Sequence, residues 1–232
     1  MLEVKPKAVR WEPPTDLKEV QVGRWRIVHR YQSKPVAYPM YKQGGMDYVR
    51  VASAKETFLQ QQDDDGVWHD WMTDQPPYWY AMANYGKLAS GRVLVLGLGL
   101  GLVLRPLAKN SNVESVVVCE RQPEVIEMVW EQLNLDGRFE LRQGDFFDLD
   151  WSGTTFNTVI ADIWTGKTAD PELQEVFLKA YDKINSQWPT ATAWYHSVDP
   201  WAKELTRRKH AHVLTPNRVA LLAAMSQEWQ RA

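Results

Sequence analysis

Cysteine is nearly absent from this sequence, since Cys119 is the only one among 232 residues. A single thiol cannot close a disulfide within the chain or complete a cysteine-built zinc site, and it fits a reducing compartment. An excess of either charge is also missing, because 27 lysines and arginines face 29 aspartates and glutamates. This balance gives no sign of a nucleic-acid-binding surface, although it does not exclude a local basic patch.

Long apolar runs are missing as well, and residues 1–14 lack the apolar core of a signal peptide. We therefore expect a cytoplasmic protein that does not cross a membrane. The acidic run at 63–65 could suggest a metal site, but three acids beside Gly66 are typical of a hairpin tip in solvent, so we predict none. Tryptophan is abundant, with 12 copies, and we expect most of them to pack in the core and at interfaces.

The stretch 92–101 reads RVLVLGLGLG, so an unbroken apolar run leads directly into three alternating glycines. An unbroken apolar run is what a strand buried on both faces requires, as at the centre of a parallel sheet. Glycines just past such a strand allow a sharp turn and leave room for a ligand close to the backbone. We interpret the stretch as the first strand-to-helix turn of a nucleotide-type binding fold.

Apolar strands and helical segments alternate after this stretch, which predicts right-handed βαβ units and a parallel sheet. A helix over 78–88 precedes the sheet, beginning at a Pro-Pro pair. The fold class predicted is α/β, a doubly wound and mainly parallel sheet of Rossmann-like type. The expected strands are 92–96, 113–119, 139–142, 158–160 and 190–195, and the expected helices are 102–109, 123–133, 171–184 and 200–208, with 213–225 open between strand and helix.

The N-terminal part has a different pattern. Residues 1–23 are rich in proline and mixed in charge, so we expect an extended arm. From 24 to 75 apolar residues recur about every second position rather than every third or fourth, and turn signals lie at 44–45 and 63–66. These features predict a small antiparallel β-meander domain, followed by the Rossmann-like cofactor-binding domain over 76–232.

Acidic residues follow three of the predicted parallel strands. Glu120 comes after the second strand, at close to the ~20-residue spacing from the glycines at which an acid binds ribose hydroxyls. Asp145 follows the third strand and Asp162 the fourth. Ligands bind beyond the carboxyl ends of such strands, so these acids are candidate ligand-binding groups. The alternative is that they only cap the following helices.

The glycine spacing also bears on the cofactor. The dinucleotide fingerprint is G-x-G-x-x-G, whereas this chain has G-x-G-x-G followed by Leu102. Acids after three strands fit a cofactor that lies across several strand ends better than one that presents a single pyrophosphate. The pattern therefore favours S-adenosylmethionine over NAD.

Four motifs together resemble the ordered motifs of class I S-adenosylmethionine-dependent methyltransferases, and more closely the spermidine-synthase branch of that fold. They are Val93-Leu-Val-Leu-Gly97-Leu-Gly99-Leu-Gly101, Val118-Cys-Glu120, Gly144-Asp145 and Val159-Ile-Ala-Asp162. The resemblance covers roughly residues 45–200, and the branch also has a small N-terminal β-domain. It implies S-adenosylmethionine as the cofactor.

The resemblance also implies roles for individual residues. Gly97, Leu98, Gly99 and Gly101 would pass under the methionine part of the cofactor. Glu120 would hold both ribose hydroxyls. Asp145 would accept from the adenine amino group, with Arg121 and Phe146 flanking the ring. Asp162 would stand beside the sulfonium as the catalytic residue.

The chain departs from the aminopropyltransferases after the fourth strand. Those enzymes have an acid, two small hydroxyl residues, a second acid and a proline, whereas this chain reads Asp162-Ile-Trp-Thr-Gly166. Thr165 replaces the acid that would pair with a substrate ammonium, and Trp164 fills a place meant for a small residue. This difference argues against polyamine synthesis and leaves the cofactor motifs intact.

We expect the substrate side to be built from the β-domain, the segment 68–76 and the loops after the fourth and fifth strands. Asp74 is the acid most expected in the cleft, and Trp164 and His196 follow the fourth and fifth strands. His196 could serve as a general base, although a lone histidine there is more often structural. Several tryptophans could form an aromatic box, or, as we favour, attach the β-domain to the sheet: Trp68, Trp71, Trp79, Trp164 and Trp194.

Three functions remain open from the sequence. The first is a methyltransferase that acts on a small molecule, with Asp162 orienting or deprotonating the acceptor. The second is an aminopropyltransferase like spermidine synthase, and the third is a non-catalytic protein that binds S-adenosylmethionine. A homodimer through the β-domain is plausible from the resemblance, and neither nucleic acid nor membrane is expected as a partner.

Overall fold

A five-stranded parallel sheet forms the centre of the computed structural model, which describes residues 8–9, 15–42, 45–164 and 171–196. Its strand order is β10-β9-β8-β11-β12, and each neighbouring pair is parallel. The strands are β8 (Gly91–Leu96), β9 (Val113–Glu120), β10 (Phe139–Gln143), β11 (Thr158–Ala161) and β12 (Thr192–Tyr195). The chain runs from β8 outward to β10 on one side and then returns to β11 on the other, so the strand order reverses between β8 and β11.

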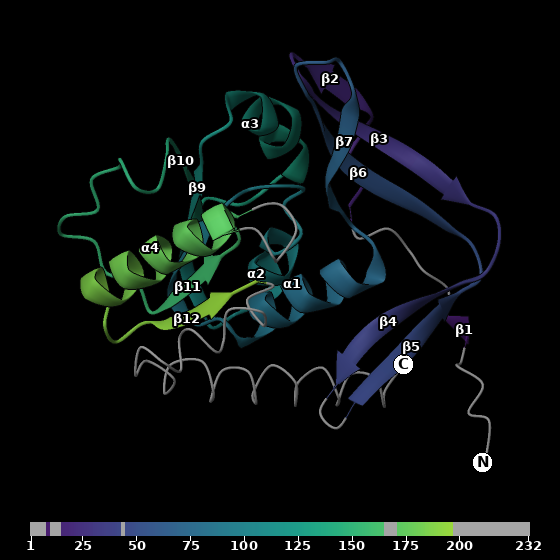
Figure 1. Cartoon of the computed structure of the whole chain (residues 1–232). Coiled ribbons are helices and arrows are strands. Elements are labelled where there is room, and N and C mark those ends of the chain that lie inside the picture. The colour runs from purple at the N-terminus through teal and green to yellow at the C-terminus, as the bar shows by residue number, and fades with distance from the viewer. Residues whose placement is uncertain (1–7, 10–14, 43–44, 165–170, 197–232) are drawn as a thin grey trace.

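Helices cover both faces of this sheet, as Figure 1 shows, and the predicted doubly wound α/β fold is confirmed. Alternate residues of β8 point to opposite faces: Val93 and Val95 belong to one buried cluster, Leu94 and Leu96 to the other. The first cluster contains side chains of the first three helices, and the second those of the last. The helices are α1 (Pro76–Leu88), α2 (Leu104–Lys109), α3 (Pro123–Val129), which continues as the 3-10 turn η1 (Trp130–Leu133), and α4 (Pro171–Gln187).

The N-terminal strands form two sheets, not the single meander expected from the apolar spacing. One is antiparallel with the order β2-β3-β6-β7, and the other has the order β1-β5-β4, in which β1 pairs parallel to β5. The strands β1 and β2 thus lie within residues 1–23, which the sequence predicts to be an extended arm. Spacing of two shows that a segment is extended but not which strand it pairs with. The strands are β1 (Ala8–Val9), β2 (Val20–Val22), β3 (Trp25–Gln32), β4 (Val36–Lys42), β5 (Gly45–Val51), β6 (Ala54–Gln62) and β7 (Trp68–Thr73).

The antiparallel sheet packs against the Rossmann-like part. Trp25 and Ile27 of β3 and Leu59 of β6 belong to the same buried cluster as Val93 and Val95 of β8. In Figure 1 the strands β3, β6 and β7 lie beside α3 and α1. One face of the antiparallel sheet is therefore turned toward the parallel sheet. This contact brings β7 next to the carboxyl ends of the parallel strands.

The acidic run between β6 and β7 forms the tip of their hairpin, as its composition indicated. The Asp63 carboxylate accepts hydrogen bonds from the Val67 amide and pairs with His69, and the Gly66 amide donates to the Asp63 carbonyl. Among the described residues no group of histidine, cysteine and acidic side chains could hold a metal ion. No helix in the described part has both the length and the apolar character needed to span a bilayer. The expected helix 200–208 and the open segment 213–225 lie outside the described residues.

Candidate active site

A cavity of about 780 Å³ lies where the carboxyl ends of the parallel strands face β7 and α1. From the parallel sheet it is lined by the loop after β8, by Glu120 at the end of β9, by Asp145 after β10 and by Asp162 after β11. The opposite wall is largely apolar and comes from the antiparallel sheet and α1: Trp25, Leu59, Trp71, Met72, Tyr78 and Met82. The cavity therefore has three acids at the strand ends, and aromatic and thioether groups, together with the Arg30-paired Asp70, on the opposite side.

Glu120 is buried at the end of β9, and its carboxylate is held by the chain itself. Oε2 accepts a hydrogen bond from the Leu98 amide at 2.8 Å, and Oε1 accepts from the amides of Arg121 and Gln122 at 2.8 and 2.9 Å. A carboxylate offers about four acceptor positions, so three are taken within the chain. The side chain ties the glycine loop to the turn after β9, and one acceptor position on Oε2 remains.

The three glycines are each closely covered by atoms of the protein. A Cβ at Gly97 would lie 2.6 Å from the Asp162 carbonyl oxygen, and one at Gly99 would overlap the Met72 sulfur. A Cβ at Gly101 would lie 2.6 Å from Leu133 Cδ1. Gly97, Leu98 and Gly99 line the cavity, whereas Gly101 is buried and does not. The expectation that Gly101 passes under a cofactor is therefore not supported, because its missing Cβ makes room for the core residue Leu133.

Met72 is a cavity residue that the sequence did not single out. Its sulfur accepts a hydrogen bond from the Leu100 amide at 3.3 Å and lies directly over Gly99. The contact joins β7 to the loop after β8, two segments far apart in the chain. A sequence pattern in the β-domain does not indicate which part of the Rossmann-like domain it will touch, so no signal could have identified this contact.

Asp145 and Arg121 face each other across the cavity edge. Asp145 Oδ1 accepts from the Phe147 amide at 2.8 Å, and its Oδ2 lies 3.8 Å from Arg121 Nη1. Both side chains are partly exposed, so this ion pair is weak and can be opened by a ligand. Phe146 also lines the cavity, but its ring is buried and packs against Phe147 and Trp151.

Asp162 lies in the cavity directly after β11. Its amide donates to the Leu96 carbonyl at 3.0 Å, which fixes it beside the end of β8. Burial raises the pKa of the Asp162 carboxyl above its usual range, and the neighbouring His196 acts in the opposite direction. A carboxyl with a raised pKa in a cavity is a candidate proton acceptor.

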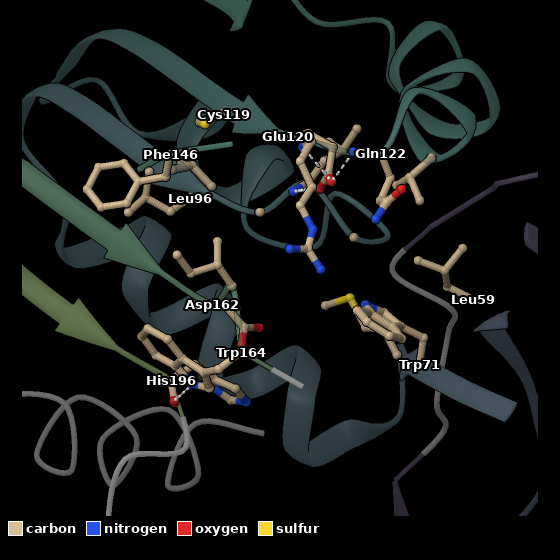
Figure 2. Close-up of a pocket in the computed structure, with 18 of the residues that line it drawn as sticks. Leu59, Trp71, Leu96, Cys119, Glu120, Gln122, Phe146, Asp162, Trp164 and His196 are labelled. Carbon is tan, nitrogen blue, oxygen red and sulfur yellow. Dashed lines mark hydrogen bonds between the residues drawn. The ribbon is translucent and has the colours of Figure 1, made fainter. Parts of the chain in front are cut away.

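His196 follows β12 and also lines the cavity, on the same side as Asp162 and Trp164 in Figure 2. Its amide donates to the Ala161 carbonyl at 3.0 Å, and its carbonyl accepts from the Trp164 indole at 2.8 Å. Its ring nitrogen Nδ1 is buried and has no hydrogen-bond partner among the described residues.

Trp164 lines the cavity but is largely a core residue. It is buried, and its ring packs edge-on against Phe177 and stacks on Tyr195. The other tryptophans do not form an aromatic box with it. Trp71 lines the cavity and packs on Trp25, and Trp194 stacks on Tyr85. The Arg26 guanidinium lies over the Trp68 ring, and Trp79 packs on the core.

Asp74 does not lie in the cleft, contrary to the expectation for the acid of the substrate site. It is fully buried beneath β6, where its carboxylate accepts from the Thr57 amide at 2.8 Å and from the Thr15 hydroxyl at 3.4 Å. Burial raises the pKa of the Asp74 carboxyl. The side chain thus connects the chain after β7 to β6. The acid of this segment that does line the cavity is Asp70, which forms a two-pronged ion pair with Arg30.

Tyr78 is a second cavity residue that the sequence did not single out. It lies in the first turn of α1, and its ring centroid is 5.6 Å from that of His196. Burial raises the pKa of the Tyr78 hydroxyl, and the charge of Asp162 adds to the effect. The helix was predicted, but the residues that its first turn directs toward the strand ends depend on how α1 packs.

Comparisons with known proteins give partial likenesses. No protein-family model matches the sequence, and no curated protein resembles it closely enough to count as a match. Among solved structures, the CcbJ methyltransferase from Streptomyces caelestis is 28% identical over 37% of this chain and 36% of its own, with a TM-score of 0.31. A Trypanosoma brucei PRMT1 enzyme–prozyme complex with AdoHcy is 26% identical over 44% of this chain and 33% of its own (TM-score 0.32).

A third similar structure is the N-terminal domain of EvdMO1 with SAH bound. It is 24% identical over 36% of this chain and 36% of its own length, with a TM-score of 0.30. The chain thus spans about a third of the length of each of these structures.

Proposed function

We propose that this chain is an S-adenosylmethionine-dependent methyltransferase that acts on a small molecule. The observation that carries the proposal is the convergence of Glu120, Asp145 and Asp162 on one cavity with the loop 97–99. In open parallel sheets, ligands bind beyond the carboxyl ends of the strands at the point where the strand order reverses. Here that point lies between β8 and β11, directly beneath the cavity.

The residues present fit such a cofactor. The free acceptor position on Glu120 Oε2 suits a ribose hydroxyl, one rather than the two expected from the sequence. Asp145 keeps Oδ2 for the amino group of a base, since only its Oδ1 is engaged by a backbone amide. The cavity volume of about 780 Å³ lies within the roughly 300–1,000 Å³ typical of small-molecule sites.

The chemistry that a bound S-adenosylmethionine supplies is an electrophilic methyl carbon. The contribution of the chain is to align the acceptor with that carbon and to exclude water. Apolar groups such as Trp71 and Met72 close the cavity opposite the strand ends. Asp162 orients the acceptor or accepts its proton, and positioning of this kind lowers the barrier by fixing the reacting groups in advance.

Calorimetric titration of the pure protein with S-adenosylmethionine, its demethylated product and NAD tests the proposal. We expect both sulfur compounds to bind and NAD to bind weakly or not at all. Asp162→Asn should keep the cofactor affinity but lower methyl transfer across a panel of metabolites. If NAD bound more tightly than S-adenosylmethionine, or if Asp162→Asn abolished binding in a folded protein, the assignment would be wrong.

Two other functions from the sequence predict different outcomes. An aminopropyltransferase would release methylthioadenosine from decarboxylated S-adenosylmethionine and putrescine. A non-catalytic binding protein would take up S-adenosylmethionine without turnover of any acceptor. A cytoplasmic location, a homodimer and the absence of a nucleic-acid partner remain predictions of the sequence, and gel filtration tests the dimer.

A further inference from the structure

Asp162 and His196 are neighbours because β11 and β12 pair in register. Ala161 pairs with Tyr195, so the next residues of the two strands, Asp162 and His196, stand side by side at the carboxyl ends. Adjacent strands lie about 4.8 Å apart. The bond from the His196 amide to the Ala161 carbonyl extends the ladder to this pair.

The two side chains also point to the same face of the sheet. Side chains alternate along a strand, so Asp162 points to the same face as Ile160, and His196 to the same face as Trp194. Ile160 and Trp194 both belong to the buried cluster beneath α1. On that face the ring of His196 lies 5.6 Å from Tyr78 and 6.3 Å from Tyr85. Titratable groups thus face His196 from the end of β11 and from α1.

We propose that Asp162 and His196 act together as the proton-accepting pair of the acceptor site, and that the acceptor is a hydroxyl group on a flat, apolar ring held against Tyr78. This inference rests on the proposed function and deepens it. His196 is the catalytic residue of the pair, and the Asp162 carboxylate stabilises the imidazolium that forms. Tyr78 is a binding residue that fixes the plane of the acceptor ring.

The unpartnered nitrogen is the first reason for a hydroxyl acceptor. A buried polar atom without a hydrogen bond destabilises the folded state, and His196 Nδ1 has no partner among the described residues. An imidazole nitrogen that carries a lone pair needs a donor, which a hydroxyl provides. Of the described side chains around it, the Trp164 indole is directed to the His196 carbonyl instead.

The walls of the cavity are the second reason, because they suit a flat apolar ring rather than an ammonium ion. Trp71, Met72 and Met82 supply apolar and aromatic surface. Of the two cavity aspartates beside these walls, Asp70 forms an ion pair with Arg30, and Asp162 stands beside His196, whose imidazolium it pairs with in the proposed reaction. A polyamine would find no exposed, unpaired carboxylate in this part of the cavity.

The reaction balances without a further reactant. The hydroxyl oxygen forms a bond to the methyl carbon as the carbon–sulfur bond breaks, and the electron pair of that bond goes to sulfur. The hydroxyl proton moves to the His196 imidazole and leaves to solvent when the methylated product departs. General-base assistance of this kind contributes typically 10²- to 10⁴-fold in rate.

A binding experiment tests the pair without turnover. The probes are 7-hydroxy-4-methylcoumarin and its 7-methoxy analogue, which lacks the donor, added to ¹⁵N-histidine-labelled full-length protein without cofactor. The His196 ring resonance is identified by its loss in His196→Gln. We expect the His196 resonance to shift when the hydroxyl probe is added and to remain unchanged with the methoxy analogue. Equal shifts with both probes, or none with the hydroxyl probe, would overturn the inference.

Turnover gives the second test. With S-adenosylmethionine present, we expect methylation of the hydroxyl probe and none of 7-amino-4-methylcoumarin. His196→Gln should lower the rate at least 100-fold while the calorimetric Kd for the cofactor stays within twofold of wild type. Tyr78→Leu should raise KM about two- to tenfold through loss of the aromatic contact. A His196→Gln rate within threefold of wild type, or a faster amino probe, would refute the pair. Failure of wild type to bind the cofactor would instead refute the methyltransferase proposal.

Discussion

Replacing Glu120 by glutamine separates the structural role of this side chain from its binding role. The carboxylate accepts the amides of Leu98, Arg121 and Gln122, all at 2.8–2.9 Å. A glutamine oxygen can keep two of these amides, but its NH₂ group must then face the third, so two donors oppose each other. Leu98 is buried, and its amide would lose its acceptor without gaining water.

The magnitude follows from these three bonds. An unsatisfied buried amide costs about 1–3 kcal/mol, and the other two bonds lose the extra strength that a charged acceptor gives, about 0.5–1 kcal/mol each. We expect Glu120→Gln to lower the free energy of unfolding by about 3 kcal/mol in the protein without cofactor. For a chain of this size such a loss lowers Tm by roughly 6–12 °C.

Thermal unfolding followed by circular dichroism, and calorimetric titration with S-adenosylmethionine, measure the two effects separately. Loss of a charged acceptor for a ribose hydroxyl should raise the Kd about 10- to 100-fold at a temperature where the variant is folded. Glu140→Gln is the matched control, because Glu140 is a more exposed glutamate on the adjacent strand β10, where its carboxylate pairs with Arg142. A Glu120→Gln Tm within 2 °C of wild type would refute the structural reasoning.

Three further changes test other parts of the structure. Gly101→Ala should destabilise the protein by about 1–3 kcal/mol in chemical denaturation because its Cβ meets Leu133, whereas Gly137→Ala, whose Cβ meets nothing within 4 Å, should not. Burial raises the pKa of Asp74, so this carboxyl binds more protons in the folded state than in the unfolded state. The contribution of Asp74 to the free energy of unfolding therefore falls as pH rises from about 4. Asp74→Asn should weaken this pH dependence in urea titrations between pH 4 and 7. Burial raises the pKa of Cys119 to about 12, so iodoacetamide at pH 8 should label it about a thousandfold more slowly than a free thiol, and the rate should recover in denaturant.

The parallel sheet could be predicted because a short, local stretch of sequence is enough to identify each of its strands. An apolar run such as 92–96 reports burial on both faces, and the alternation with helices fixes the parallel arrangement. The meeting of Glu120, Asp145 and Asp162 followed, since the carboxyl ends of parallel strands share one edge. Nothing comparable fixed the N-terminal strands, because β3 pairs with β6 across the inserted β4–β5 hairpin.

Side-chain contacts between distant segments could not be predicted from the sequence, for a related reason. Asp74 was expected in the cleft because it lies in the segment 68–76, which was expected to build the substrate side, yet Asp70 lines the cavity and Asp74 is buried under β6. A register shift between Leu59 and Gln60 interrupts the pairing of β6 with β7. A shift of one residue reverses which side chains face inward, so strict alternation cannot be extended across such a point.

The glycine motif shows why a sequence pattern and a ligand site are separate inferences. Each of the three positions excludes a Cβ because of the protein's own atoms: the Asp162 carbonyl at Gly97, the Met72 sulfur at Gly99 and Leu133 at Gly101. Close strand ends and a tight first turn would require these glycines even if no cofactor bound. The acids carry the functional inference instead, because Asp145 is partly exposed at the cavity, and Glu120, although buried and held by three amides, keeps one acceptor position on Oε2.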